Sequence, residues 1–121
     1  MLRGVRGATT VAADTREEVL RAVSELLEKM REANMFAITD IASVLFSVTG
    51  DIKSVFPAVA ARSIGWGKVP LLCFQEIEVP DSLKLCIRVL IHINTHKSQD
   101  EIRHIYLKGA RSLRPDLSYD E

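Results

Sequence analysis

The sequence predicts an α+β fold, in which two main helices cover one face of a mixed sheet of about five strands. Three observations support this prediction. Two segments repeat apolar residues at helical spacing, about five others are β-branched or alternate in polarity, and the order is strand, helix, strand, helix, then mostly strands. A chain of 121 residues suits a single domain over residues 1–121, and we expect residues 115–121 to form a flexible tail.

The first strand is predicted over residues 2–11, where β-branched residues favour extended backbone. Side chains alternate along a strand, so Arg3 and Arg6 are expected on opposite faces and need separate explanations. Gly4 and Gly7 mark positions where another segment of the chain can approach the backbone closely.

A long helix is predicted from Thr15 to about Asn34. Thr15 and Glu18 match a capping box, and acidic residues occupy the first turn, where the helix dipole favours them. Apolar residues recur at three- and four-residue spacing and form one stripe: Val19, Val23, Leu26, Leu27 and Met30. The opposite face of this helix is charged, and we expect it to be solvated.

The middle of the chain contains a strand, a short helix and a second extended segment. Ile41 to Val48 is a β-branched and aromatic run and the best candidate for a central strand. Pro57 suits the first turn of a helix that Gly65 ends at the C′ position. Residues 69–79 are predicted to be extended.

The strongest strand is predicted over residues 83–94. One of its faces is wholly apolar: Leu85, Ile87, Val89, Ile91 and Ile93. The other face carries, by alternation, Cys86, Arg88, Leu90 and His92. Cys86 and Leu90 are too apolar for a face open to solvent, so we expect a second interface there, and hence an oligomer. A strand over about 103–107 and a helical turn over 108–113 complete the predicted fold.

Composition excludes several classes of protein. Apolar residues make up 47% and charged residues 26%, which is close to the globular average and excludes intrinsic disorder. Sixteen Lys and Arg balance sixteen Asp and Glu, whereas a dedicated nucleic-acid-binding protein would show a basic surplus. No apolar run approaches the roughly 20 residues of a membrane span, and the N-terminal segment lacks the apolar core of a signal peptide. We therefore expect a cytoplasmic protein without nucleic-acid or membrane partners.

Metal and nucleotide signatures are absent from the sequence. Two cysteines, Cys73 and Cys86, are too few for a disulfide framework, and we expect them to be reduced and to lie in adjacent strands. The chain has no CxxC pair, no HExxH and no Gly-rich phosphate loop, so neither a metal nor a cofactor is predicted. The three histidines, His92, His96 and His104, are expected to have surface or packing roles.

Arg88 is the residue that most needs a partner. It lies mid-strand in the most apolar stretch of the chain, and burying a guanidinium costs several kcal/mol unless it is paired. Either it forms a structural ion pair with Glu76 or Glu78, or it binds an anion. Arg6, which lies among small residues, is open to the same two explanations.

The other candidates have plain structural explanations. Cys73 has no Lys or His beside it in the sequence, which disfavours a nucleophilic role. Phe56 can pack onto the second helix as a hydrophobic staple, and the positive charge of Arg62 suits the negative end of that helix. Tyr106 can be a core residue of its strand. Four arginines nevertheless remain for a site that binds a small polyanion: Arg6, Arg62, Arg88 and Arg114.

Five sequence blocks occur in the order and spacing of a known family. They are RGVRGATTV, VFPAVAAR, VPLLCFQE, CIRVL and IRHIYLKGARSLRPDL, and they extend from about Leu2 to Leu117. On these blocks the chain resembles the monofunctional trimeric chorismate mutases of bacteria, the small α+β class with this activity. Each block alone is weakly specific, whereas the five together are highly specific.

The resemblance implies that the protein converts chorismate to prephenate, the branch step toward phenylalanine and tyrosine. It also implies a homotrimer, with the sheets packed toward the centre as a pseudo-barrel and three active sites at the subunit interfaces. The reaction is a [3,3] rearrangement within a single dianion. Such a reaction is accelerated by selecting one conformer and stabilising charge, and it requires no acid, base, nucleophile, metal or cofactor.

Individual residues acquire roles from the same resemblance. Arg88 would face the ether oxygen of the breaking bond, and Arg6 would hold a carboxylate. Glu76 and Cys73 would hydrogen-bond the ring hydroxyl, and Tyr106 would contact a carboxylate. The remaining residues would line or close the pocket: Phe56, Ala58 and Arg62 from the neighbouring subunit, Leu72 through its backbone, and Leu113 and Arg114 from the C-terminal segment.

Two positions depart from the pattern of the family. Val59 stands where some relatives carry a lysine near the pocket mouth, and Leu72 stands where some carry a polar residue. Two other functions stay open, namely a non-catalytic trimer that binds small carboxylates on the same fold and a deaminase-like trimer of related architecture. A mere binding scaffold would not need the joint set of Arg6, Glu76, Arg88 and Tyr106. The deaminase-like alternative lacks support in the CFQE and CIRV segments.

Overall fold

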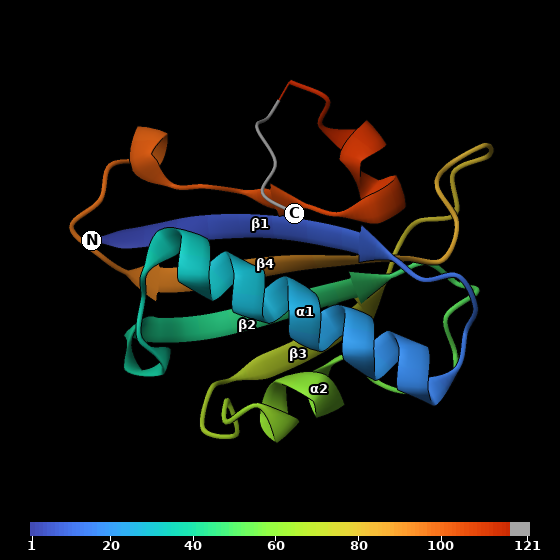
Figure 1. Ribbon diagram of the computed structural model, residues 1–121, viewed down its shortest axis with the longest axis horizontal. Helices are drawn as coiled ribbons and strands as arrows, with labels where there is room; N and C mark the ends of the chain where they lie inside the picture. Colours follow the sequence, from blue (N-terminus) through green and yellow to red (C-terminus); the bar gives the residue numbers. More distant parts are fainter. Residues whose placement is uncertain (117–121) are drawn as a thin grey trace.

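Residues 1–116, which the computed structural model of this protein describes, form one five-stranded sheet with two α-helices packed against it (Figure 1). The strand order is β3-β2-β4-β1-β5. Both β1 (Leu2–Thr10) and β2 (Ile41–Val48) run antiparallel to β4 (Cys86–Asn94). The edges are β3 (Leu71–Gln75), which is parallel to β2, and β5 (Ile105–Tyr106), which is parallel to β1. The predicted mixed α+β sheet is confirmed.

Helix α1 (Arg16–Asn34) has nearly the predicted bounds, and one of the two hydrogen bonds of the predicted capping box is present. Thr15 Oγ1 accepts a hydrogen bond from Glu18 N at 3.2 Å, as a capping box requires. The Glu18 carboxylate, however, accepts from Ala13 N at 3.0 Å, because Thr15 N already donates to Ala13 O. The side chain of Asn34 ends the helix by donating to Met30 O and to Arg103 O, each at 2.9 Å.

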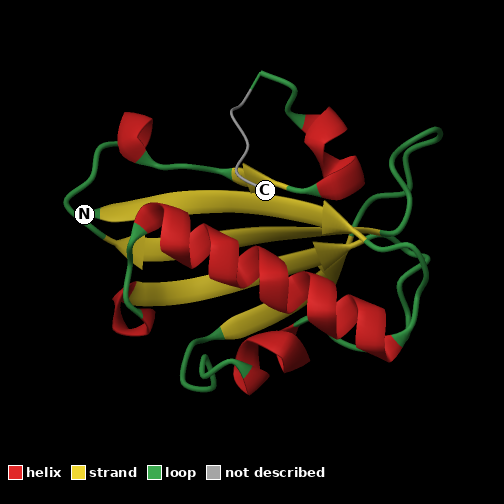
Figure 2. Cartoon of the chain, viewed as in Figure 1, coloured by secondary structure: helices red, strands yellow, loops and turns green. Residues whose placement is uncertain are grey.

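Helix α2 (Ala58–Ser63) follows the predicted signals at both ends. Pro57 precedes it with helical φ and ψ, where a missing N–H costs nothing. Gly65 follows its end with φ +97°, a left-handed conformation that glycine adopts without strain. The helix is therefore short, and it lies against α1 and β3 on the same side of the sheet (Figure 2).

Several strand ends differ from the prediction. The 69–79 segment contributes only five residues to β3, and β4 begins at Cys86 because Leu85 has φ +50° and donates its N–H to the Asp51 side chain. Only Ile105 and Tyr106 form β5. Lys108–Leu113 forms a 3₁₀ helix, η3, where a helical turn is predicted. Two further short 3₁₀ helices, η1 (Ile38–Asp40) and η2 (Gln99–Glu101), precede β2 and β5.

Two other predictions can be compared with this topology. Cys73 and Cys86 are free thiols, but their strands are not adjacent, since β2 lies between β3 and β4. That part of the prediction is wrong because sequence neighbours need not pair in a sheet. Of the predicted tail, residues 117–121 lie outside the described residues.

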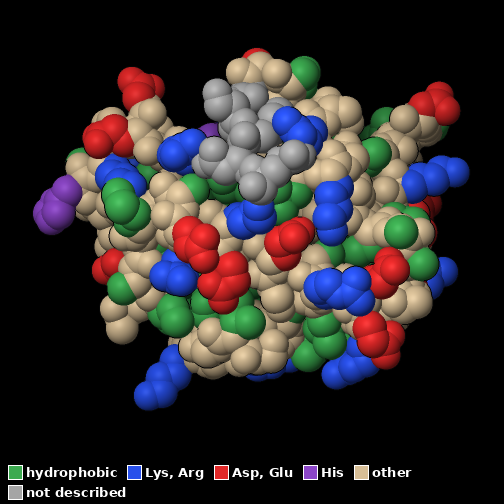
Figure 3. All heavy atoms as spheres, in the orientation of Figure 1, with side chains coloured by type: hydrophobic (Ala, Val, Ile, Leu, Met, Phe, Trp, Pro, Cys, Tyr) green, Lys and Arg blue, Asp and Glu red, His purple; other side chains and the backbone are tan. Residues whose placement is uncertain are grey.

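The core lies between α1 and one face of the sheet. The predicted apolar stripe of α1 is fully buried: Val19, Val23, Leu26, Leu27 and Met30. It packs on Ile87, Val89, Ile91 and Ile93 of β4, the face that the alternation predicts to be apolar. The outer face of α1 carries a mixture of acidic and basic side chains (Figure 3). This confirms the predicted solvated face.

The second face of the sheet is not covered by a helix, and its composition is less apolar than expected. Leu90 is partly exposed, whereas Cys86 is only 2% exposed within the single chain. Cys86 therefore gives no indication of an oligomer, which corrects part of the argument from sequence. Other apolar side chains are exposed on this side, with Leu72 at 59% and Phe74 at 52%.

Candidate active site

One hollow on the open face of the sheet brings together six of the predicted site residues. Its volume is about 510 Å³, and its lining includes Arg6, Glu76, Arg88, Tyr106, Leu113 and Arg114. Arg6, Arg88 and Tyr106 lie on β1, β4 and β5. Glu76 directly follows β3, Leu113 ends η3, and Arg114 directly follows it. Three strands, together with the segments that follow β3 and end η3, thus contribute these side chains to a single concave surface.

The strand register places Arg6 and Arg88 side by side. In the antiparallel pair of β1 and β4, Arg6 is opposite Leu90 and Arg88 is opposite Ala8. The two arginines are therefore diagonal neighbours on the same face, a relationship that corresponds to roughly 7–8 Å and lets long side chains reach one another. Two guanidinium groups at this spacing form a positive surface for an anion with more than one negative group.

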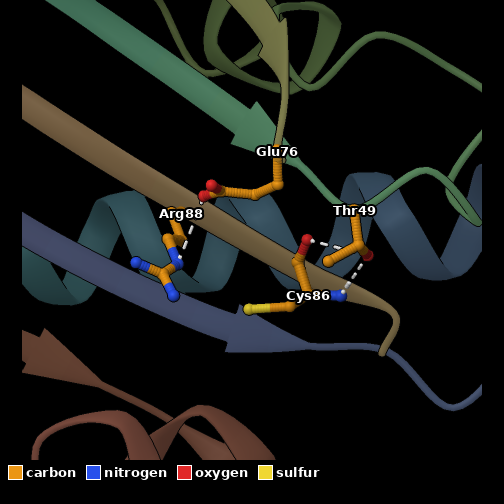
Figure 4. Close-up of polar contacts among 4 residues, drawn as sticks. All are labelled: Thr49, Glu76, Cys86 and Arg88. Carbon is orange, nitrogen blue, oxygen red and sulfur yellow. Dashed lines mark hydrogen bonds and ion pairs between the residues drawn. The ribbon is translucent and has the colours of Figure 1, made fainter. Parts of the chain in front are cut away.

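Arg88 forms the predicted ion pair with Glu76 (Figure 4). Arg88 Nε lies 3.3 Å from Glu76 Oε2, and the side chains are 51% and 30% exposed. The expectation that Arg88 is buried is therefore wrong for the single chain, because its alternation directs it to the open face. The contact uses Nε, and Figure 4 shows the terminal guanidinium nitrogens directed away from Glu76. Ion pairing and anion binding are thus compatible at this residue.

Cys86 lies beside this pair (Figure 4). Burial raises the pKa of the Cys86 thiol, and the nearby Arg88 guanidinium only partly offsets that effect. The thiol is therefore protonated at neutral pH. It does not neutralise Arg88.

His104 contacts the backbone of Arg6 through a hydrogen bond. The backbone N–H of Arg6 donates to His104 Nδ1 at 2.9 Å, so this nitrogen is an acceptor and carries no proton. Burial lowers the pKa of His104, and the positive charges of Arg6 and Arg114 lower it further. The neutral ring therefore accepts the N–H of Arg6 directly before β5 begins at Ile105. The sequence indicated only a surface or packing role for this histidine.

Tyr106 and Leu113 form the wall of the hollow next to β1. Tyr106 is 6% exposed and packs on Ala8 and Ala110, with Leu113 partly buried against this cluster. The core position predicted for Tyr106 is therefore correct, and the same residue also lines the hollow. Its position is set by the short parallel pairing in which Ala8 is opposite Tyr106.

Arg114 reaches the same hollow from the C-terminal side. Its Nε and Nη2 donate to the two carboxylate oxygens of Asp116 at 3.0 and 2.9 Å. The hydrogen bond from Arg114 lowers the pKa of Asp116. The bidentate contact orders residues 114–116 at the rim of the hollow.

The remaining predicted residues do not meet this hollow within one chain. Phe56 and Cys73 line a separate hollow of about 490 Å³ near α2, and Cys73 packs against the core. Ala58 is buried in α2, whereas Arg62 on the same helix and Leu72 on β3 are exposed. Cys73 and Glu76 are three residues apart in an extended segment, and this odd separation directs their side chains to opposite faces.

Other residues in the hollow could not be predicted from one strand at a time. Leu45, Ser47, Phe74 and Leu90 also line it. Ser47 lies directly opposite Arg88 in the pair of β2 and β4. Its place in the site follows from the strand register, which the sequence of β2 alone does not contain.

Neither a metal site nor a membrane-crossing helix is found in the described part of the chain. Among residues 1–116, no group of three or more His, Cys, Asp or Glu side chains is arranged to hold a metal ion. Within the same residues, neither α-helix combines the length and the apolar character of a membrane-crossing segment.

Comparisons with known proteins agree with the geometry. Residues 2–117 match the family model described as chorismate mutase type I. The chain is 50% identical over 119 residues to chorismate mutase AroH of Bacillus subtilis (strain 168), covering 98% of this chain and 94% of the relative. It is 52% identical over 118 residues to chorismate mutase AroH of Thermus thermophilus, covering 97% of each chain.

A solved structure gives the same result for the fold. A chorismate mutase from Clostridium thermocellum superimposes with a TM-score of 0.90 and 45% sequence identity, covering 91% of this chain and 98% of that one. The likeness therefore includes the sheet, both helices and nearly all of the sequence. The match of the family model to residues 2–117, together with relatives at about half identity, shows that this chain belongs to the type I chorismate mutase family.

Proposed function

We propose that this protein catalyses the rearrangement of chorismate to prephenate, with Arg88, Arg6 and Glu76 as the central residues of the site. The observation that carries the proposal is the pair of arginines on the open face, together with the carboxylate of Glu76. Family membership supports it, since the relatives at 50% and 52% identity are both named chorismate mutases. The alternative of a non-catalytic carboxylate binder is not favoured, because these two relatives and the solved structure are all named as chorismate mutases.

The chemistry matches the side chains that are present. One C–O bond of the substrate breaks and one C–C bond forms within the same molecule, so no proton or group is transferred to the protein. Negative charge grows on the ether oxygen as the C–O bond breaks. The terminal nitrogens of Arg88 would stabilise that charge, and a fixed donor of this kind contributes more to the transition state than to the ground state.

Glu76 and Arg6 would act on other parts of the substrate. Glu76 would accept a hydrogen bond from the ring hydroxyl and stabilise the partial positive charge on the ring. Arg6 and Tyr106 would hold carboxylates, which favours the compact conformer from which the reaction proceeds. Arg114 and Leu113 would close the site from the η3 side.

The proposal includes a homotrimer with the site shared between neighbouring chains. The hollow that contains Arg88 lacks five of the predicted site residues, namely Phe56, Ala58, Arg62, Leu72 and Cys73. In this proposal a second copy of the chain supplies them. The open sheet face supports such an assembly, because Leu72 and Phe74 expose apolar side chains there. A cytoplasmic location stays a prediction from the sequence.

The test is an assay of the purified protein with chorismate, following the loss of the diene absorbance and identifying the product. We expect rapid conversion to prephenate. If a folded protein of trimeric mass gives no conversion, the proposal is wrong. A chorismate-like dicarboxylate bound between Arg6 and Arg88 would then indicate the binding function instead.

A further inference from the structure

The turn of residues Thr49 to Asp51 follows β2, the strand that lies between β3, which ends just before Glu76, and β4, which carries Arg88. The backbone N–H of Thr49 donates to Cys86 O at 3.0 Å. Cys86 N donates back to Thr49 Oγ1 at 2.9 Å (Figure 4). The Thr49 hydroxyl has one proton, and Asp51 Oδ1 at 2.5 Å is a much closer acceptor for it than Cys86 O at 3.4 Å. The hydroxyl therefore acts as acceptor and donor at the same time.

Asp51 extends this contact to the residue before β4. Its two carboxylate oxygens accept from Leu85 N at 3.2 and 3.0 Å. Leu85 has φ +50°, a left-handed conformation that is uncommon for a leucine. The carboxylate thus holds the main chain in an unfavourable conformation directly before β4 begins, and this sets the direction in which the strand starts.

Both ends of the Arg88–Glu76 ion pair depend on this turn. Cys86 lies two residues before Arg88, so the position of its backbone determines where the Arg88 side chain leaves the sheet. On the other side, Glu76 N donates at 2.8 Å to the carbonyl of Val48, the residue before Thr49. A short segment of β2 and its turn therefore fixes the main chain at both partners.

We propose that Thr49 and Asp51 are positioning residues for the rearrangement, which hold Arg88 and Glu76 at their working separation through the hydroxyl–carboxylate contact. This inference rests on the proposed roles of Arg88 and Glu76. Neither Thr49 nor Asp51 lines the hollow that contains both Arg6 and Arg88, whereas Thr49 lines a second hollow beside Glu76 and Arg88. Their effect on the reaction is therefore indirect, through the backbone of β4 and the end of β3.

The test compares Thr49→Val with Thr49→Ser. Valine keeps the shape of threonine and removes the hydroxyl, whereas serine keeps the hydroxyl. Since a displacement of about 1 Å in a catalytic group can lower a rate by roughly 100-fold, we expect Thr49→Val to lower kcat by about 10- to 100-fold. KM should change by a smaller factor, because the lost contact is made mainly in the transition state. Thr49→Ser should restore most of kcat.

A second measurement does not depend on turnover. The NMR signal of the Arg88 Nε–H group reports its contact with Glu76, and it should shift or broaden in Thr49→Val and return in Thr49→Ser. Asp51→Asn is the second variant, because its amide oxygen can still accept from Leu85 N while the charge is lost. Asp51→Asn should also lower kcat and shift or broaden the Arg88 signal. If one of the two variants does not fold, the other still tests the proposal.

Asp40→Asn is the matched control. The Asp40 carboxylate also accepts a backbone N–H, from Ala37 at 2.9 Å, but at the opposite end of β2. It should leave kcat and the Arg88 signal unchanged. The proposal is overturned if the turn variants fold, retain wild-type kcat and leave the Arg88 signal in place. If the wild-type protein shows no turnover, the proposed function fails, and the Arg88 signal still decides whether the turn positions this residue.

Discussion

The two faces of the sheet are built from the same strands and have different tasks. Along β4, Ile87, Val89, Ile91 and Ile93 are buried under α1, whereas Arg88 between them is half exposed on the open face. The alternation of side chains thus lets one strand contribute to the core and to the site at successive positions. A substitution on one face should therefore affect stability, and a substitution on the other should affect the reaction.

The two faces also differ in what covers them. The helix-covered face is completed within the chain by α1 and α2 (Figure 1). The open face leaves charged groups and the apolar side chains of Leu72 and Phe74 accessible. Its hollow lacks the residues near α2 that the family resemblance assigns to the same pocket. Folding completes the first face, and the second is proposed to be completed by assembly.

The largest expected effect is a loss of catalytic rate without a loss of stability, caused by a substitution of Arg88 on the open face. Arg88→Ala should lower the rate of chorismate conversion by a factor that corresponds to about 3–4 kcal/mol, the typical loss for one transition-state donor. The free energy of unfolding should change by no more than about 1 kcal/mol, because half-exposed ion pairs contribute little to stability. Steady-state kinetics and urea unfolding measure the two quantities.

A matched control for Arg88→Ala lies on α1. Arg31 forms a similarly exposed ion pair with Glu28, at 3.4 Å between Nη2 and Oε2. Arg31→Ala should leave both the rate and the stability nearly unchanged. Near-normal turnover in Arg88→Ala would contradict the role that we assign to the open face.

The next effect compares two glycines of β1 that lie on opposite faces. A Cβ at Gly7 would overlap Met30 Sδ and lie 3.2 Å from Leu26 Cδ1, and both neighbours are fully buried. Gly7→Ala should therefore destabilise the protein by about 1–3 kcal/mol, as overpacked cores do. A Cβ at Gly4 meets only Leu90 Cδ1 at 3.3 Å on the open face, and Gly4→Ala should stay within about 0.5 kcal/mol.

Thermal or urea unfolding of both glycine variants tests this comparison. The double variant Gly7→Ala/Met30→Ala should lose less free energy of unfolding than the two single variants lose together, since the shortened side chain at position 30 removes the overlap. Equal stability of Gly4→Ala and Gly7→Ala would show that the two faces do not differ in packing as described.

The smallest effect is confined to acidic pH and concerns His104. Its pKa in the folded protein is lowered from 6.5 by burial and by the charges of Arg6 and Arg114, and Arg114 is itself paired with Asp116. The unfolded chain therefore binds the proton at higher pH than the folded chain does. The associated stability is present above about pH 6.5 and is lost as the pH falls through the lowered pKa.

His104→Asn tests this linkage, because the asparagine oxygen can accept from Arg6 N but does not titrate. We expect the variant to lose less stability than the wild type between neutral and mildly acidic pH, and to keep more of its kcat/KM there. His96→Asn, at an exposed histidine, is the control. Identical pH profiles for the wild type and His104→Asn would contradict the role of the neutral ring.

Local signals in the sequence were sufficient for much of the fold. Thr15, the apolar stripe of α1 and the β-branched run of β2 each depend on neighbours within a few positions, and their elements have the predicted bounds or nearly so. Gly65 likewise ends α2 where its conformational freedom indicates. Arg6 and Arg88 were found as charges that interrupt apolar or small-residue strands.

Features that depend on distant partners could not be predicted in the same way. The start of β4 is decided by Asp51, which is far from Leu85 in the sequence. His104 gained its role because the strand pairing places its ring against Arg6 N, and Ser47 because the register places it opposite Arg88. These relationships are set by tertiary contacts. The predicted site residues near α2 still require a partner chain for their test.

The most direct measurement of the central claim mixes two inactive variants in one assembly. Arg88→Ala damages the open face, and Arg62→Glu places a negative charge in the α2 region that is proposed to reach a neighbour's site. Co-expressed in equal amounts with different tags, they should recover about a quarter of wild-type activity. This follows because about three quarters of the trimers are mixed and one of three sites in each is intact. If the co-expressed variants form mixed trimers but remain as inactive as each variant alone, the site is not shared between chains, and the account is contradicted.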